Sequence, residues 1–180
     1  MTSPQVVSQS AFTDGLIETP PTAQASLPGQ VQSMTTEAAP ASDEPVFVAR
    51  ELVDIYRDAV AGGFEPYYEC HDEDRFVATF VSRQGLGLRL APMPERQRML
   101  GLSYPGGLSR DTTAVLCEVD RRPVMLFVDR MAADRVQLEL AAQDGIGLYR
   151  RELQGLVIYE VTPLDDARMT DYLVIAPRRK

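Results

Sequence analysis

One short stretch concentrates the residue types that could bind a metal or act as a nucleophile. The sequence "YYECHDED" (67–74) contains Cys70, one of two cysteines, and His71, the only histidine, among several carboxylates. A zinc site needs about four ligands, usually Cys or His at set spacings. Neighbouring residues in an extended segment point in opposite directions, and no CxxC, HxH or HExxH pattern accompanies the pair. We therefore expect no metal ion and no cofactor.

A reactive thiol is the second chemistry that this stretch raises. Cys70 would precede a helix N-terminus, which lowers a thiol pKa, whereas the neighbouring acids stabilise the protonated thiol. A Cys–His pair also needs a third group to orient the imidazole. We favour a structural interpretation in which Asp72 caps a helix, the acids after it match the helix dipole and His71 packs at the helix entry. A metal- or redox-responsive protein using Cys70 and His71 is kept as the alternative.

The loop "GLSYPGGLSRDTT" (101–113) is the other candidate site. It contains neither the GxSxG nucleophile elbow nor the GxxxxGK[ST] phosphate loop. Gly106-Gly107 with Arg110 could hold a small anion through backbone N–H groups, or the glycines could serve only the turn geometry of a long connection. Because binding sites favour loops on a rigid sheet, we predict binding residues at Ser103, Tyr104, Gly106, Gly107, Ser109, Arg110, Asp111 and Thr112.

Two helices are expected ahead of the loop 101–113. The first is predicted from Ser42 or Asp43, with Pro45 in its first turn, to Gly62-Gly63. Its apolar face would consist of Ala49, Leu52, Val53, Tyr56, Ala59 and Val60. The second helix would start at Asp72, bury Phe76, Val77, Phe80 and Val81, and stop at Gly85.

The remaining chain has the period-two and β-branched pattern of strands. Short strands are predicted at 87–92 and 98–104, and two hairpins at 112–129 and 146–161, the second with a Gln154-Gly155 turn. Cys117 would be buried, while Asp129-Arg130 and Asp134-Arg135 would form surface ion pairs. The C-terminal segment fits either a helix through Met169, Tyr172, Leu173 and Ala176 or a strand at "YLVIA", and we favour the helix.

These elements predict an α+β fold: two N-terminal helices packed on one face of an antiparallel sheet of four to five strands, followed by a C-terminal helix. Residues 1–44 contain five acids and no Lys or Arg, and they are rich in Pro, Ser and Thr. Such a composition predicts a disordered tail, so residues 45–180 would form a single domain.

The charge and hydropathy of the chain exclude several classes of partner. A formal net charge of −8 argues against nucleic-acid binding through phosphate contacts. No run of 18 apolar residues is present, so we expect no transmembrane helix and no membrane partner. No secretory signal is visible, and a cytoplasmic location with free thiols is the expectation.

The run 62–130 resembles a family of uncharacterised bacterial proteins. The shared features are a "GFEP…C…F…F" opening, a "GLSY.GGLSR.TTA" loop and a "PVM.FVDR" strand; this resemblance implies no activity. Residues 72–160 also resemble the C-terminal domains of bacterial transmembrane anti-sigma factors, through Phe76, Phe80, Gly85, Leu100-Gly101 and Val124–Val128. The chain lacks their membrane helix and their HxxxCxxC element, so this resemblance implies a sensory or structural module.

Together these observations predict a protein that is not an enzyme. No nucleophile–base pair or cofactor motif is recognisable in the sequence. We expect a binding or regulatory module that recognises a protein partner or a small ligand through the loop 101–113 and the adjacent aromatic connector 64–70.

Overall fold

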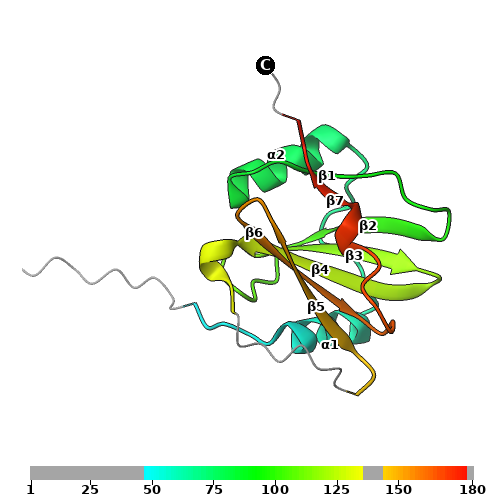
Figure 1. Ribbon diagram of the computed structural model, residues 1–180. Coiled ribbons are helices and arrows are strands. Elements are labelled where there is room, and N and C mark those ends of the chain that lie inside the picture. The colour runs from blue at the N-terminus through cyan, green and yellow to red at the C-terminus, as the bar shows by residue number, and fades with distance from the viewer. Residues whose placement is uncertain (1–46, 136–143, 178–180) are drawn as a thin grey trace, which may run out of the picture. The chain divides into compact units, whose positions relative to one another are not determined.

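A computed structural model describes residues 47–135 and 144–177, all within the unit Glu44–Lys180. The predicted tail (1–44) and the predicted first-helix cap at Ser42, Asp43 and Pro45 lie outside the described residues. The α+β class is confirmed, with more strands than predicted (Figure 1). In chain order the elements are α1 Leu52–Ala61, α2 Glu73–Gln84, β1 Leu88–Leu90, β2 Gln97–Ser103, β3 Thr113–Val119, β4 Arg122–Arg130, β5 Gly147–Leu153, β6 Leu156–Thr162 and β7 Leu173–Ile175.

The larger sheet has five antiparallel strands in the order β2-β3-β4-β6-β5. Both predicted hairpins are present, and each closes through a two-residue turn. Asp120 and Arg121 have φ values of 50° and 65°, and Gln154 and Gly155 have φ values of 46° and 86°. Positive φ at both central residues matches the right-handed twist of the flanking strands, which fixes the register of each pair.

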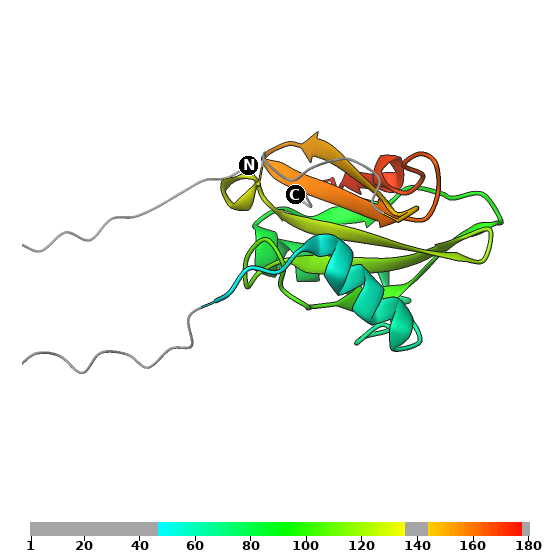
Figure 2. The ribbon, with the colours of Figure 1, turned by 90° about the horizontal axis from the view of Figure 1, so that it is seen from below.

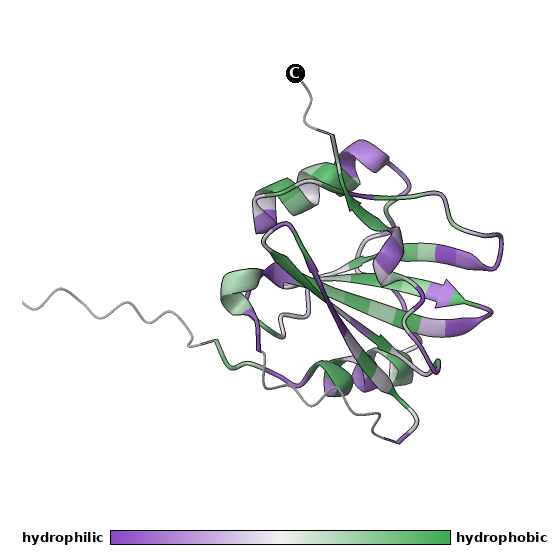
Figure 3. Ribbon diagram, in the orientation of Figure 1, coloured by the Kyte–Doolittle hydropathy of each residue, from purple (hydrophilic) through white to green (hydrophobic). Residues whose placement is uncertain are grey.

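The central strands are buried on both faces. Residues of β3, β4 and β6 that point to one side pack with α2, β1 and β7, and the alternate residues pack with α1. Figures 1 and 2 show the two helices on opposite sides of the sheet. The prediction that both helices cover one face is therefore wrong. Strands covered on both faces have continuous apolar sequences. In β4 this run is Val124 to Val128, and the middle of the strand is accordingly hydrophobic in Figure 3.

Helix α1 starts later than predicted. Its N-cap is Glu51, which makes no side-chain capping hydrogen bond, and Phe47–Arg50 are not helical. The Phe47 ring packs beside Gly106 of the β2–β3 loop. This tertiary contact holds the chain ahead of the helix, and the buried face consists of Leu52, Ile55 and Tyr56.

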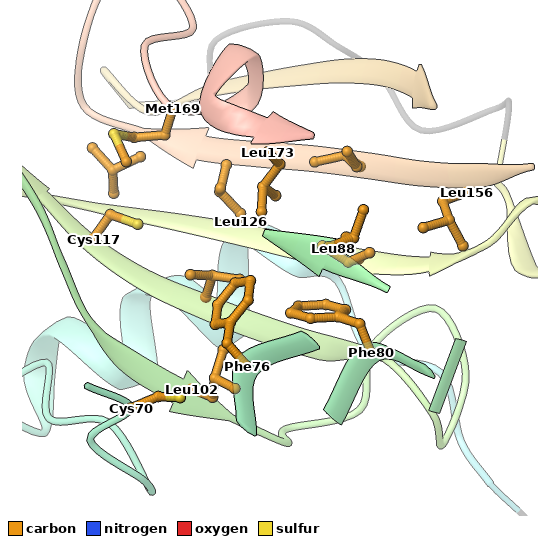
Figure 4. Packing of buried hydrophobic residues seen from close by; sticks show 14 of the residues in the cluster. Cys70, Phe76, Phe80, Leu88, Leu102, Cys117, Leu126, Leu156, Met169 and Leu173 are labelled. Atoms are coloured by element: carbon orange, nitrogen blue, oxygen red, sulfur yellow. The ribbon is translucent and has the colours of Figure 1, made fainter. Parts of the chain in front are cut away.

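Helix α2 follows the prediction closely. The Asp72 carboxylate accepts a hydrogen bond from the Arg75 amide at 3.0 Å, and Gly85 takes the left-handed conformation at the C-terminus. Phe76 and Phe80 are buried against the sheet, with ring centroids 4.9 Å apart (Figure 4). The predicted buried residue Val81 is instead 51% exposed, because it faces away from the sheet.

The C-terminal segment is not an α-helix. A single 3-10 turn, Thr170–Tyr172, leads into β7, which pairs antiparallel with β1 through Leu88↔Ile175 and Leu90↔Leu173. The favoured helix is thus wrong and the alternative strand is present, because pairing with a strand over eighty residues earlier decides the conformation. Across the described residues, no helix is both long and apolar enough to cross a membrane.

Candidate functional site

The β2–β3 loop lies between α1 and the C-terminal end of α2. Its two glycines are buried rather than open to solvent. A Cβ atom at Gly107 would lie 2.9 Å from Leu52 Cδ2, and Gly107 has a φ of 126°. Both the space and the backbone conformation require glycine there. Gly107 therefore allows close packing against α1, and Gly106 lies against the Phe47 ring ahead of that helix. The predicted anion cradle at Gly106-Gly107 is not an open site.

A buried carboxylate of β4 holds the polar side chains of this loop. Asp129, 1% exposed, accepts hydrogen bonds from Ser109 Oγ at 2.6 Å and from Thr112 Oγ1 at 2.7 Å. Its other oxygen accepts from the Arg130 amide at 2.7 Å. Ser109 Oγ in turn accepts from the Asp111 amide at 3.0 Å. The hydroxyl groups that the sequence offers as binding groups are thus engaged inside the molecule.

The predicted surface ion pairs are wrong. Asp129 faces inward and bonds to hydroxyl groups. Asp134 pairs with Arg150 at 2.5 Å and accepts from the Tyr159 hydroxyl at 2.6 Å. The Arg150 hydrogen bond lowers the pKa of Asp134, and burial raises the pKa of Tyr159 to about 12. The alternation of side chains along a strand already indicates that Asp129 points inward, because it places Asp129 on the same face as the apolar residues Met125 and Phe127.

The end of α2 fixes the backbone of the same loop from the other side. Gln84 Nε2 donates to the Asp111 carbonyl at 2.6 Å, and Arg83 Nη2 donates to the Arg110 carbonyl at 3.0 Å. Arg135 donates to the Gly107 carbonyl at 2.7 Å. Sequence reasoning missed these three side chains, because each acts on backbone oxygens, which no residue pattern reveals.

An exposed aromatic pair lies where the loop leaves β2. Tyr67 is 82% exposed and Tyr104 is 37% exposed, and their rings meet edge to face with centroids 5.9 Å apart. The Arg83 guanidinium lies 4.6 Å from the Tyr104 ring centroid. The Ser103 hydroxyl accepts from the Tyr67 amide at 2.9 Å. We call Tyr67, Tyr104 and Arg83 the Tyr–Arg patch.

The predicted loop residues therefore divide into two groups. Ser103, Gly106, Gly107, Ser109 and Thr112 hold the local structure together. Tyr104, Arg110 and Asp111 are exposed and present side chains to solvent. The structure adds Tyr67 from the connector and Arg83 from α2 to this second group.

The Cys70–His71 pair does not form a joint site. Cys70 is buried, and its thiol lies 3.4 Å from the Asp72 carbonyl; Figure 4 shows it within the core beside Leu102. The His71 ring is 84% exposed and lies 3.3 Å from Glu69. Cys117 is also buried, which raises the pKa of its thiol. Within residues 47–135 and 144–177, no group of three or more His, Cys, Asp or Glu side chains is arranged to hold a metal ion.

A second buried carboxylate lies on the opposite face of the sheet. Glu160 of β6 accepts three backbone hydrogen bonds, from the amides of Arg168, Met169 and Thr170, at 2.8, 2.9 and 2.9 Å. Burial raises the pKa of Glu160, and the three amide donors oppose that change. The arrangement fixes the β6–β7 connection, and Glu160 is 0% exposed to solvent.

Comparisons of the chain with protein-family models, with curated proteins and with solved structures find no match. The two resemblances noted in the sequence therefore stay predictions. The function of the protein is therefore inferred from the geometry of the β2–β3 loop and of the Tyr–Arg patch.

Proposed function

We propose that this protein is a non-enzymatic binding module that recognises a protein partner through the Tyr–Arg patch and the exposed side chains of the β2–β3 loop. The single observation that carries the proposal is the exposed pair Tyr67 and Tyr104, held in a fixed arrangement by the surrounding structure. Tyr and Arg are enriched among the residues that dominate binding energy at protein interfaces.

The fixed geometry of the patch favours binding. The Tyr67 amide is tied to Ser103, and Tyr104 lies under the Arg83 guanidinium. Immobilising a side chain at an interface costs about 0.5–1.5 kcal/mol. Because Arg83 also donates to two loop carbonyls, much of that ordering is already present in the free protein.

The exposed loop side chains extend the patch with both charge signs. Arg110 and Asp111 follow one another at the solvent side, while their carbonyls accept from α2. A polar border around an aromatic centre is the usual arrangement of a protein interface. A protein surface with an apolar centre and mixed charges around it therefore fits better than a small ligand.

The test is capture of a partner from a lysate of the source cells with immobilised full-length protein. We expect the double variant Tyr67→Ala/Tyr104→Ala to lose at least about tenfold in capture, with an unchanged circular dichroism spectrum. The matched control is Val48→Ala/Val60→Ala, which removes two other exposed apolar side chains. Equal capture by both double variants would exclude the patch as the recognition surface.

Two single variants separate this proposal from a metal- or redox-responsive role. Cys70→Ser should leave capture intact, and Arg110→Ala should weaken it by removing a charge from the exposed part of the β2–β3 loop. Loss of capture in a correctly folded Cys70→Ser protein, with Arg110→Ala silent, would favour the Cys70 alternative instead.

A further inference from the structure

The connector that carries Tyr67 closes the edge of β2 beside the Tyr–Arg patch. The Tyr68 amide donates to the Leu102 carbonyl at 3.0 Å, and the Leu102 amide donates to the Tyr68 carbonyl at 2.8 Å. A Cβ atom at Gly101 would collide with the Tyr68 carbonyl oxygen and would lie 2.7 Å from Pro66 Cβ, so only glycine lets the connector lie this close. The backbone groups of β2 at Leu102 are therefore not open to a partner strand.

The backbone around the two tyrosines of the patch does not suit strand addition either. The Tyr67 amide already donates to Ser103 Oγ. Pro66 and Pro105, which flank the two tyrosines in the sequence, have no N–H group. A partner that adds a strand is held by main-chain hydrogen bonds, and the patch has too few main-chain donors for this mode of recognition.

The patch instead presents aromatic faces and side-chain donors. The rings of Tyr67 and Tyr104 meet at 67°, so their faces form the two sides of an angled apolar surface. Within the part of the chain that the structure describes, neither tyrosine hydroxyl makes a hydrogen bond. Arg83 holds the loop through Nε and Nη2, and the N–H groups of its Nη1 take no part in those bonds.

A polyproline II segment is the kind of peptide whose groups match this surface. An α-helix bonds its own carbonyls to its own amides, so it would offer no backbone acceptor to the tyrosine hydroxyls or to Arg83. A polyproline II segment has no internal hydrogen bonds, and its prolines contribute carbonyl acceptors and no N–H donors. Segments of this kind dock on aromatic-lined surfaces.

From this match we infer that the partner presents a proline-rich polyproline II segment to the Tyr–Arg patch. Proline rings pack against Tyr67 and Tyr104, and carbonyls of the segment accept hydrogen bonds from the tyrosine hydroxyls and from Arg83 Nη1. The inference rests on the proposed function, and it adds the chemical class of the segment that the patch recognises.

The test uses decaproline, with a Gly-Ser peptide of equal length as the control. Each peptide is titrated into the ¹⁵N-labelled full-length protein and followed by the amide shifts of Tyr67, Ser103 and Tyr104 and by the side-chain Nε signal of Arg83. We expect saturable shifts at these positions with decaproline, and at least about tenfold weaker binding of the Gly-Ser peptide. Equal binding of the two peptides, or shifts confined to other parts of the protein, would overturn the inference. So would tighter binding of an oligothymidylate, because bases also stack on exposed aromatic rings.

Two double variants separate the contribution of the rings from that of the hydroxyls. Tyr67→Ala/Tyr104→Ala should bind decaproline at least about tenfold more weakly than the wild type. Tyr67→Phe/Tyr104→Phe keeps both rings and should lose about threefold to tenfold. The matched control Val48→Ala/Val60→Ala should bind as the wild type does, and all variants should keep the wild-type circular dichroism spectrum. Equal affinities in the three double variants would contradict the inference, and an unchanged affinity in the phenylalanine variant would contradict the role of the hydroxyls.

The two assays together distinguish failure of this inference from failure of the proposed function. If Tyr67→Ala/Tyr104→Ala loses capture from the lysate but the wild type does not bind decaproline, the patch is the recognition surface and the proline-rich segment is wrong. If the same variant retains both capture and decaproline binding, the proposed function and the inference fail together.

Discussion

The sheet has one buried carboxylate anchor on each face, and the two anchors hold their loops by different means. Asp129 lies on the α1 face and binds two hydroxyl side chains, Ser109 and Thr112, together with one backbone amide. Glu160 lies on the α2 face and binds three backbone amides at 168–170. Both carboxylates are almost completely buried.

The difference concerns what each loop can do when its anchor is removed. A hydroxyl group can rotate toward another acceptor or toward water, whereas an amide of a fixed backbone cannot. Thr112 Oγ1 also lies 2.9 Å from the Ser109 carbonyl, which offers an alternative acceptor. The Glu160 anchor should therefore matter more for stability, and the Asp129 anchor more for the shape of the binding loop.

The largest effect is expected for Glu160→Ala. The buried amides of Met169 and Thr170 and the part-buried amide of Arg168 would lose their acceptor. Each loss costs about 1–3 kcal/mol, before the structure relaxes and before the cost of burying the Glu160 charge is removed. We expect a net loss of about 3–4 kcal/mol in the free energy of unfolding, measured by urea denaturation. The exposed Glu65→Ala is the control and should change it by less than about 0.5 kcal/mol. A similar small value for Glu160→Ala would show that the loop does not depend on this carboxylate.

Asp129→Ala should cost less stability, about 2 kcal/mol, because the hydroxyl groups find other partners. The loop itself should loosen, so partner capture through the Tyr–Arg patch should fall more than in Glu160→Ala at a temperature where both variants are folded. If the two variants lose capture equally, loop shape is not what the Asp129 anchor provides.

The pH dependence of stability sharpens the comparison further. The pKa of Glu160 is raised above its ordinary value of 4.5, so the folded state holds this proton more tightly than the unfolded state. Its stabilising contribution is present at low pH and is lost as the pH rises from about the ordinary pKa through the raised one. Asp134, whose pKa is lowered, contributes in the opposite sense, and this contribution is lost as the pH falls.

Comparing Glu160→Gln with the wild type isolates the contribution of Glu160 to the pH dependence, because Asp134 is present in both proteins. The stability of this variant relative to the wild type should increase as the pH rises from 4.5 to 8, in urea titrations at each pH. A difference that stays constant, or one that decreases with pH, would contradict the raised pKa.

The smallest effects come from the partners of the two anchors. Thr112→Ala removes a side-chain donor to Asp129 and should cost about 1–1.5 kcal/mol. Arg168→Ala keeps the amide that Glu160 binds and removes only a surface ion pair with Asp166, so it should cost less than about 0.5 kcal/mol. If urea denaturation shows a larger loss of stability for Arg168→Ala than for Thr112→Ala, the distinction between side-chain and backbone anchoring is wrong.

Local patterns predicted much of the secondary structure. The Asp72 cap, the Gly85 stop and the Gln154-Gly155 turn are all where the sequence indicates, because each depends on residues within a few positions. The hairpins β3–β4 and β5–β6 follow for the same reason. The interpretation of Cys117 as a buried residue is also confirmed.

The errors share a different origin. The C-terminal strand exists through pairing with β1, and the late start of α1 accompanies the contact of Phe47 with Gly106. Both depend on partners far away in the sequence. The placement of the helices on opposite faces had a visible signal, since β3, β4 and β6 lack the polar alternation of a one-sided sheet.

The candidate site was predicted only in part. The sequence indicates the loop and Tyr104, but it does not separate hydroxyl groups that face solvent from those that bind Asp129. That distinction depends on the register of β3 against β4, which places Thr113 opposite Val128 and so brings Thr112 next to Asp129. The contribution of Arg83 depends on where α2 ends in space.

The central claim is that the β2–β3 loop is held from inside and therefore presents a fixed Tyr–Arg patch. Amide hydrogen exchange by NMR, on the wild type and on Asp129→Ala, tests it most directly. We predict slow exchange in the wild type for the amides of Ser109 and Asp111, which bond to side-chain oxygens. Asp129→Ala should accelerate these amides and leave those of 168–170 unchanged. Wild-type exchange at Ser109 and Asp111 as fast as in an unstructured peptide would contradict the account.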